Sequence, residues 1–435
     1  MKWHRLETDL VGDENNGRNR LPEQAKVAEI QDRQNDPRCH NRALVLEVLR
    51  SRGPASRTEL ASTTTLSAPT VLEIVEELKA RGLVHEDGTG PSTGGRRPVL
   101  LNLAPRARCS VGLAVGSREL SAAVVDLKGN TELRVRVPSG LNEGPAALAA
   151  QVKKVLRRVL GELPVGLGEP LGVGLALPAP VTASTGGVLS FPTREEWGEL
   201  RIRELVADEF DLPVIVDNAA NAAAVGEHLF GAGQGVRHMF YLLLHRGVGG
   251  ASVVDGKVYR GADGGAGEAG HMRIDLNGPR CGCGNYGCLE AYVGRVAIRE
   301  RAIRAMKLSG RHEMGGERLE ELRAEDVVSA GLAGDELAGE VLRDTGKYLG
   351  VGIANMVHLL NPELVVVGGS TVRAGELLLK PAAEVLERQV LPSVAQQARV
   401  LPGELGEDAG AMGAAALVLR ELFAVSALPA LRQNL

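Results

Sequence analysis

The chain has 435 residues and a formal net charge of −4 at pH 7, and 24% of its residues are charged. This length allows two or three domains, and the balanced charge gives no sign of a protein that binds nucleic acid over its whole surface. No apolar run is long enough to span a bilayer, and the polar N-terminus lacks the apolar core of a signal peptide. We therefore expect a cytoplasmic protein with no membrane partner.

Residues 1–38 are polar and contain turn-forming runs such as Asn15-Asn16-Gly17. We expect a flexible N-terminal arm here, with a short helix over residues 23–31 as one option. Such an arm is more often a plain tail than a contact with DNA or with another subunit.

Residues 39–104 predict three helices followed by two strands. The first helix ends near Gly53-Pro54, the second covers residues 57–61, and Ser67 caps the third, which has Pro69 in its first turn. Apolar residues of the third helix recur at helical spacing and predict one buried stripe, made of Val71, Ile74, Val75 and Leu78. Strands at 83–85 and 98–103 flank a glycine-rich segment. This order is typical of a winged helix-turn-helix domain, whose third helix enters the major groove.

The expected wing is locally basic, although the whole chain is not. Between Gly88 and Cys109 there is no acidic residue, but there are four arginines, at positions 96, 97, 106 and 108. We predict that Arg96 and Arg97 contact the phosphates or the minor groove, and that the start of the third helix approaches the base edges through Ser67, Ala68 and Thr70. A small helical domain that binds protein is the alternative, and the acid-free wing favours double-stranded DNA.

The rest of the chain predicts two successive α/β units. The first, residues 105–230, has strands at 110–115, 120–127, 171–177 and 214–216 and helices at 146–160 and 219–229. The second, residues 231–409, has strands at 239–244, 251–254 and 364–367 and helices at 296–306, 336–359 and 375–388. A last helix within residues 410–435 is expected to join the first unit. Two such sets predict two lobes with a cleft between them, faced by the glycine turns at the strand ends.

Three of the five cysteines lie in one glycine-rich turn, at Cys281, Cys283 and Cys288, and His271 precedes them. Three thiolates and one imidazole are the ligand set of a closed structural Zn²⁺ site. A disulfide or free thiols are the alternative, but Cys281 and Cys283 are too close in sequence to form an easy bridge. Glu268 and Glu290 flank these ligands, so a metal would hold two carboxylates near each other, which favours a polyol or sugar site over a surface feature.

Three motifs carry a resemblance to a known family: Gly267-Glu268-Ala269-Gly270-His271, the segment from Cys281 to Glu290, and Asn361 to Gly369. From about Cys39 onward, the chain resembles the ROK family (repressors, open reading frames and kinases), and more narrowly its xylose-repressor-like transcriptional regulators. The resemblance implies an actin-like, hexokinase-like pair of lobes and a homodimer on a palindromic operator. It also implies a sugar shell of Asn218, Glu268, His271 and Glu290, with His271 contacting both zinc and the sugar ring.

The chain departs from the family's kinases at three loops. Their Asp-x-Gly-Gly-Thr phosphate loop reads Ala114 to Arg118 here, and their Gly-Thr-Gly loop reads His245-Arg246-Gly247. The aspartate that takes the proton from the sugar hydroxyl is Ala219, and losing a general base typically costs about 10²–10⁴-fold in rate. Asp217 is not expected to replace it, because neighbouring side chains of a strand point in opposite directions. We therefore expect no kinase activity.

The leading hypothesis is a DNA-binding transcriptional regulator, a repressor of carbohydrate-utilisation genes, with a monosaccharide as effector. The first alternative is an ATP-dependent sugar kinase with an appended DNA-binding domain, and Ala114 and Ala219 speak against it. The second is a DNA-anchored protein whose lobes bind a partner, such as a phosphotransfer-system component, in place of a sugar.

Overall fold

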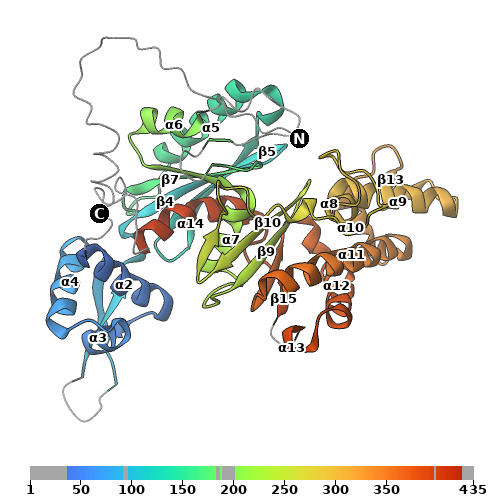
Figure 1. Cartoon of the computed structure of the whole chain (residues 1–435). Helices are drawn as coiled ribbons and strands as arrows, with labels where there is room; N and C mark the ends of the chain where they lie inside the picture. Colours follow the sequence, from blue (N-terminus) through green and yellow to red (C-terminus); the bar gives the residue numbers. More distant parts are fainter. Residues whose placement is uncertain (1–36, 92–96, 183–186, 189–200, 396–397, 424–435) are drawn as a thin grey trace, which may run out of the picture.

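The computed structural model describes residues 37–91, 97–182, 187–188, 201–395 and 398–423. Within them, an N-terminal domain lies beside a body with two sheets (Figure 1). The expected arm and its optional helix lie outside the described residues, except that Pro37 and Arg38 already belong to the first helix.

The N-terminal domain consists of three helices and a three-stranded sheet. The helices are α2 (Pro37–Arg52), α3 (Arg57–Thr64) and α4 (Ala68–Ala80). The sheet has the order β1 (Ala55–Ser56), β3 (Val99–Leu103), β2 (Val84–Thr89), and all its pairs are antiparallel. Ser67 caps α4 as expected, and the predicted stripe of Val71, Ile74, Val75 and Leu78 is buried. The winged helix-turn-helix prediction is confirmed.

The first lobe is built on a five-stranded sheet of order β6-β5-β4-β7-β8. Its strands are β4 (Cys109–Val115), β5 (Glu119–Asp126), β6 (Thr131–Pro138), β7 (Pro170–Leu177) and β8 (Val214–Asn218). Strands β4, β5 and β6 pair antiparallel, whereas β7 and β8 continue the sheet in parallel from β4. Helices α5 (Pro145–Gly161) and α6 (Ile202–Phe210) cover its outer face (Figure 1) and share its apolar core.

The second lobe repeats this topology, with the order β11-β10-β9-β14-β15. Its strands are β9 (Met239–Leu244), β10 (Val248–Val254), β11 (Lys257–Tyr259), β14 (Leu364–Gly368) and β15 (Arg399–Pro402). The strand directions also repeat, since β9, β10 and β11 are antiparallel and β14 and β15 are parallel to β9. The predicted pair of α/β lobes is therefore confirmed.

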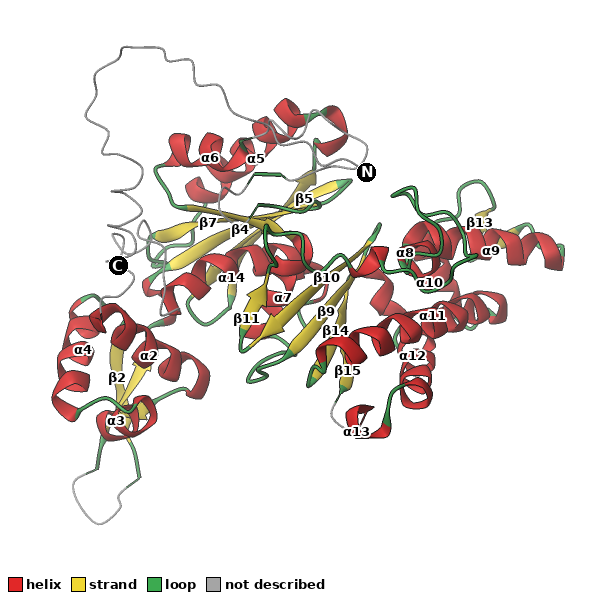
Figure 2. Cartoon of the chain, in the orientation of Figure 1, coloured by secondary structure: helices red, strands yellow, loops and turns green. Residues whose placement is uncertain are grey.

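Helices of the second lobe gather on one side of its sheet (Figure 2). They are α8 (Glu290–Val293), α9 (Arg295–Ser309), α10 (Ala324–Leu332), α11 (Glu336–Leu360), α12 (Glu376–Gln389) and α13 (Pro392–Ala395). A short hairpin of β12 (Glu313–Met314) and β13 (Glu317–Arg318) joins α9 to α10. Apolar residues of helices α8 to α12 form one core with the sheet, and this core supports the loops that leave the lobe.

Helices α7 (Ala219–Phe230) and α14 (Ala409–Phe423) lie between the two sheets. Helix α14 approaches the first sheet so closely that a Cβ on Gly112 would lie 2.0 Å from the carbonyl oxygen of Ala411. A Cβ on Gly174 would lie 1.8 Å from the carbonyl oxygen of Ala414. Only glycine fits at these positions, because no other residue lets a backbone come so near. The last helix of the described residues is thus an inner layer of the first lobe.

The N-terminal domain rests on this same helix. Its buried apolar residues and those of α14 form one continuous cluster, which includes Leu46, Leu49 and Leu422. The guanidinium of Arg50 lies 5.6 Å from the ring centroid of Phe423 and donates to the carbonyl oxygen of Leu229 at 3.0 Å. The N-terminal domain is therefore packed against the helix that lies between the lobes.

Candidate functional site

The loop between β11 and α8 brings the four predicted metal ligands together. The ligand atoms of His271, Cys281, Cys283 and Cys288 all lie within 4.8 Å of one another. Two of these separations are 3.7 Å (Cys281 Sγ to His271 Nδ1) and 3.8 Å (Cys283 Sγ to Cys288 Sγ). A tetrahedral Zn²⁺ with bonds of about 2.3 Å to sulfur sets neighbouring sulfur atoms about 3.8 Å apart. The donors have the spacing that this ion requires.

The electrostatics of the cluster also suit a cation. All the cysteines are free thiols, so no disulfide competes for the sulfurs. Burial raises the pKa of Cys281 to about 12, so this thiol stays protonated unless a positive charge is bound beside it. Backbone hydrogen bonding from Asn285 lowers the pKa of Cys283, which favours the thiolate form of that sulfur.

Two glycines hold the segment that carries Glu268 and His271 against strand β10. Gly267 has a φ of +93°, and a Cβ there would lie 2.3 Å from the carbonyl oxygen of Gly250. A Cβ on Gly270 would lie 2.1 Å from the carbonyl oxygen of Val248. Because neither position admits a side chain, the short helical turn Ala269–His271 is fixed against the sheet, and so are the two functional side chains.

One ring nitrogen of His271 faces the metal cluster, and the other faces a carboxylate. Its Nδ1 faces the sulfur of Cys281, and its Nε2 lies 3.9 Å from Glu268 Oε2. The pKa of Glu268 is raised by burial, lowered in part by His271 and raised further by Glu290. These effects require the two carboxylates to lie near each other. The structure thus gathers three of the four predicted sugar residues beside the metal cluster.

Glu290 is held in place at the start of α8. Its Oε2 accepts a hydrogen bond from the backbone N–H of Val248 at 2.9 Å, and its Oε1 lies 3.5 Å from the sulfur of Cys281. A Cβ on Gly247 would lie 2.3 Å from Oε2, so a side chain at this point of the turn would displace the carboxylate. The carboxylate therefore contacts both the metal loop and the sheet.

Asn218 comes from the other lobe, at the junction of β8 and α7. It caps α7 by accepting from the backbone N–H of Ala220 at 2.7 Å, and its Nδ2 donates to the carbonyl oxygen of Ala179 at 3.2 Å. An amide has a second hydrogen and a second lone pair, which are free for a ligand. In the described part of the chain, no direct hydrogen bond joins Asn218 to Glu268, His271 or Glu290.

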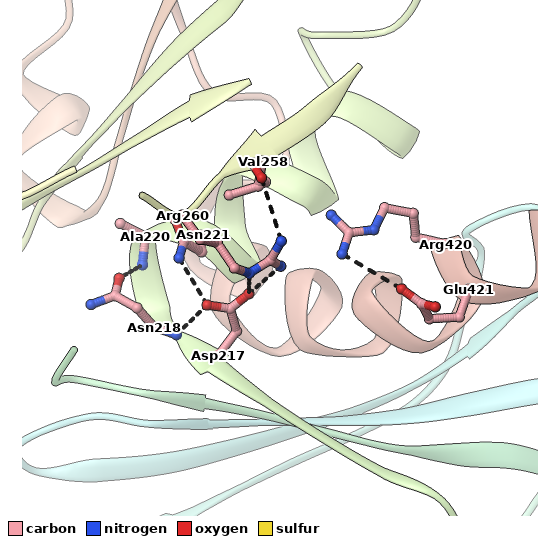
Figure 3. A network of polar contacts seen from close by, with 8 residues as sticks. All are labelled: Asp217, Asn218, Ala220, Asn221, Val258, Arg260, Arg420 and Glu421. Carbon is pink, nitrogen blue, oxygen red and sulfur yellow. Dashed lines mark hydrogen bonds and ion pairs between the residues drawn. The ribbon is translucent and has the colours of Figure 1, made fainter. Parts of the chain in front are cut away.

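An ion pair that the sequence did not predict connects the two lobes. Asp217, whose side chain is 6% exposed, accepts from Arg260 at 3.1 Å and 2.5 Å and from Asn221 Nδ2 at 2.8 Å (Figure 3). Arg260 follows β11 and begins the loop that leads to Glu268. The pair therefore links the end of β8 in the first lobe to the site loop of the second. Arg420 of α14 lies close by, and burial together with the charge of Arg260 lowers its pKa.

The predicted DNA-contacting residues lie at the start of α4 and in the wing. Ser67 and Ala68 are exposed, and the hydroxyl groups of Ser67 and Thr70 hydrogen-bond each other at 2.7 Å. Arg97 is exposed, and Arg96 lies outside the described residues. Two of the three acidic residues of α4 are paired with cations, Glu76 with Arg57 at 2.8 Å and Glu77 with Arg42 at 2.7 Å.

The fold and the site define a two-lobed protein with a winged helix-turn-helix domain and a cysteine–histidine cluster beside the carboxylates of Glu268 and Glu290. The chain belongs to the ROK family, whose model matches residues 110–421. It is 31% identical over 386 residues to a putative xylose repressor of Caldicellulosiruptor sp. (strain Rt8B.4), covering 88% of this chain and 96% of that protein. A glucokinase of Halalkalibacterium halodurans is 33% identical over 317 residues, which are 72% of this chain and 96% of that enzyme.

Among solved structures, a ROK family transcriptional regulator, described as a homolog of the E. coli MLC protein, superposes with a TM-score of 0.76 and 28% identity. It covers 91% of this chain and 99% of its own. The match to the putative xylose repressor covers 386 residues, which is more than the chain has after residue 109. The match therefore includes part of the N-terminal domain. In the described residues, no helix is both long and apolar enough to cross a membrane.

Proposed function

We propose that this protein is a transcriptional regulator that represses carbohydrate-utilisation genes and senses a sugar bound between its lobes. The observation that carries the proposal is the packing of the winged domain on α14, the helix that also lies between the two sheets. The similarity to a repressor along nearly its whole length supports the same function.

The proposed ligand is a monosaccharide held by Asn218 from one lobe and by Glu268, His271 and Glu290 from the other. Carboxylates that accept from hydroxyl groups reject ligands that lack them, so this shell selects for sugars. A bound sugar changes DNA affinity only if it binds the DNA-free geometry and the DNA-bound geometry with different affinities. Because α14 contacts both the first sheet and the winged domain, a shift between the lobes reaches the DNA-binding helices of a homodimer on a palindromic operator.

A gel-shift titration of the full-length protein on the promoter beside its own gene tests the DNA part of this proposal. We expect a shift that a scrambled duplex of equal length does not give. No shift at moderate salt with folded protein would refute it. Calorimetry with a panel of monosaccharides, followed by gel shifts with the tightest binder, tests the effector. If none of the monosaccharides binds, the result would favour a protein partner in place of a sugar.

The metal cluster supports one structural Zn²⁺ per chain, held by His271 and the three cysteines. The ion would fix the loop that carries Glu268 and Glu290, and its binding energy would add to the stability of the fold. We expect metal analysis after dialysis without chelator to find about one zinc per chain. Cys283→Ser should lower both the metal content and the thermal stability, while Cys39→Ser, outside the cluster, should change neither. Full retention of zinc by Cys283→Ser would show that the ligand set is wrong.

We also propose that the lobes no longer catalyse phosphoryl transfer. Ala219 is the first residue of α7 and follows Asn218, and its methyl group cannot accept a proton. The similarity to a glucokinase favours the alternative, a sugar kinase with an appended DNA-binding domain. Steady ATP turnover that depends on an added hexose or pentose would establish that alternative.

A further inference from the structure

Two long side chains of α4, Leu72 and Glu73, lie on the exposed surface of the N-terminal domain. Leu72 is 50% exposed, although Val71 and Ile74 beside it are buried in the core of the domain. Helix α4 lies at the left edge of this domain in Figure 1, where it packs against α2, α3 and β2. Both side chains are therefore open to a ligand that binds along this helix.

Leu72 and Glu73 lie in the part of α4 that a DNA duplex would meet. The helix begins at Ala68, so both residues belong to its second turn. In helix-turn-helix proteins, the N-terminal residues of the recognition helix contact the base edges. Residues three and four apart share a face of a helix, which places Leu72 and Glu73 on the face of the exposed Pro69. This face lies away from the buried stripe of the helix.

The hydroxyl groups at the start of α4 already have partners within the protein. Those of Ser67 and Thr70 hydrogen-bond each other at 2.7 Å, and Ser67 Oγ also accepts from the backbone N–H of Thr70 at 3.3 Å. Ala68 and Pro69 have no polar group in their side chains. Among the exposed side chains of residues 68–75, Glu73 is the one with a hydrogen-bonding group.

Glu73 also differs from the other acidic residues of its helix. Glu76 pairs with Arg57 and Glu77 pairs with Arg42, whereas Glu73 makes no ion pair or hydrogen bond within the part of the chain that the structure describes. A carboxylate brought among DNA phosphates without a donor is unfavourable, because like charges repel. In the major groove, the N4 amino group of cytosine is the donor that suits a carboxylate.

We propose that Glu73 reads a cytosine by accepting a hydrogen bond from its N4 amino group, and that Leu72 contacts the methyl group of a nearby thymine. The two bases lie within about two base pairs of each other, since neighbouring Cα atoms are about 3.8 Å apart and base pairs about 3.4 Å. This inference rests on the proposed function, because it names the bases that the same DNA-binding helix recognises.

The test of Glu73 is selection of binding sites by the full-length protein from a pool of randomised duplexes, read by sequencing. We expect the wild type to enrich a half-site with a fixed cytosine, and replacing that base pair should weaken binding by roughly tenfold. Glu73→Gln should enrich adenine at this position, because a glutamine amide pairs with adenine N6 and N7. The control is Glu76→Gln, which removes the same charge from a carboxylate that is already paired with Arg57, and it should enrich the wild-type site.

The test of Leu72 replaces single thymines of the selected site by uracil, which removes only the methyl group. One such replacement near the fixed cytosine should weaken wild-type binding in gel shifts by roughly threefold, the effect of one buried methyl group. The same replacement should leave the affinity of Leu72→Ala unchanged. Equal melting temperatures of the variants and the wild type establish that these surface substitutions leave the fold intact.

The outcomes separate this inference from the proposed function. A wild type that enriches no sequence at all would overturn both. A wild type that enriches a site, while Glu73→Gln enriches the same base at every position, would overturn the cytosine contact and leave the regulator intact. Equal uracil effects in the wild type and Leu72→Ala would likewise overturn the thymine contact alone.

Discussion

Replacing Arg260 by methionine should destabilise the protein by about 2–3 kcal/mol, a loss that follows from the burial of its partner. The Asp217 side chain is only 6% exposed, and Arg260 makes two of its hydrogen bonds. Removing one partner of a buried ion pair typically costs about 3–5 kcal/mol, since the remaining charge is left uncompensated. Here Arg260 is 26% exposed, and Asn221 and the backbone N–H of Asn218 still donate to Asp217, so we expect a value below that range.

Urea unfolding followed by far-UV circular dichroism measures this loss, and a double-mutant cycle isolates the pair. Asp217→Asn/Arg260→Met removes both charges and keeps an oxygen for Asn221, so it should be clearly more stable than Arg260→Met alone. The matched control is Arg158→Met, whose ion pair with Glu162 lies on the surface of α5 and should contribute at most about 1 kcal/mol. If Arg260→Met costs no more than this control, the ion pair does not stabilise the contact between the lobes.

Three further predictions concern the packing of α14, the wing and a buried thiol. Gly174→Ala should destabilise the protein by more than about 3 kcal/mol in urea unfolding or prevent folding, because the added Cβ would collide with the backbone of α14. The control is Gly161→Ala, which has open space around it and should stabilise α5 by about 0.5 kcal/mol. Arg97→Gln should weaken binding to specific and scrambled DNA alike and reduce the slope of log affinity against log salt by about 0.9 in gel shifts; an unchanged slope would remove Arg97 from the phosphate contacts. Cys109, whose pKa burial raises to about 12, should resist iodoacetamide at pH 8 in the folded protein, and its rapid labelling in peptide mass spectrometry would contradict that burial.

The sequence predicted those helices and strands whose apolar residues are also the buried ones. The stripe on α4 follows helical spacing, and the central strands β4, β7, β9 and β14 are continuous apolar runs, as parallel-sheet strands buried on both faces should be. The elements that were not predicted include strands β6, β11 and β15 and helices α6 and α10. The three strands lie at the edges of the sheets, where exposed polar residues interrupt the apolar pattern.

In the candidate site, too, the sequence predicted some residues and not others. The metal ligands and both glutamates lie within one short segment, so their types and spacing alone indicated a shared site. Arg260 could not be chosen from the sequence, because nothing local shows which cation neutralises a buried aspartate more than forty residues away. The sequence also did not predict the pocket of about 510 Å³ that Ser117 and Arg118 of the first lobe line together with Arg246 of the second. It forms only when the turns after β4 and β9 face each other, and no sequence spacing records that approach.

The position of α14 also sets an order of events during synthesis. This helix fills the inner face of the first lobe, yet it begins only at Ala409, long after the last strand of that lobe ends at Asn218. A chain still emerging from the ribosome can complete the second sheet first, because β15 ends at Pro402. The first lobe and the surface on which the winged domain rests must wait for residues 409–423, since contacts so distant in sequence form only when both partners exist. A ribosome-bound fragment that lacks these residues therefore has a DNA-binding domain without its support.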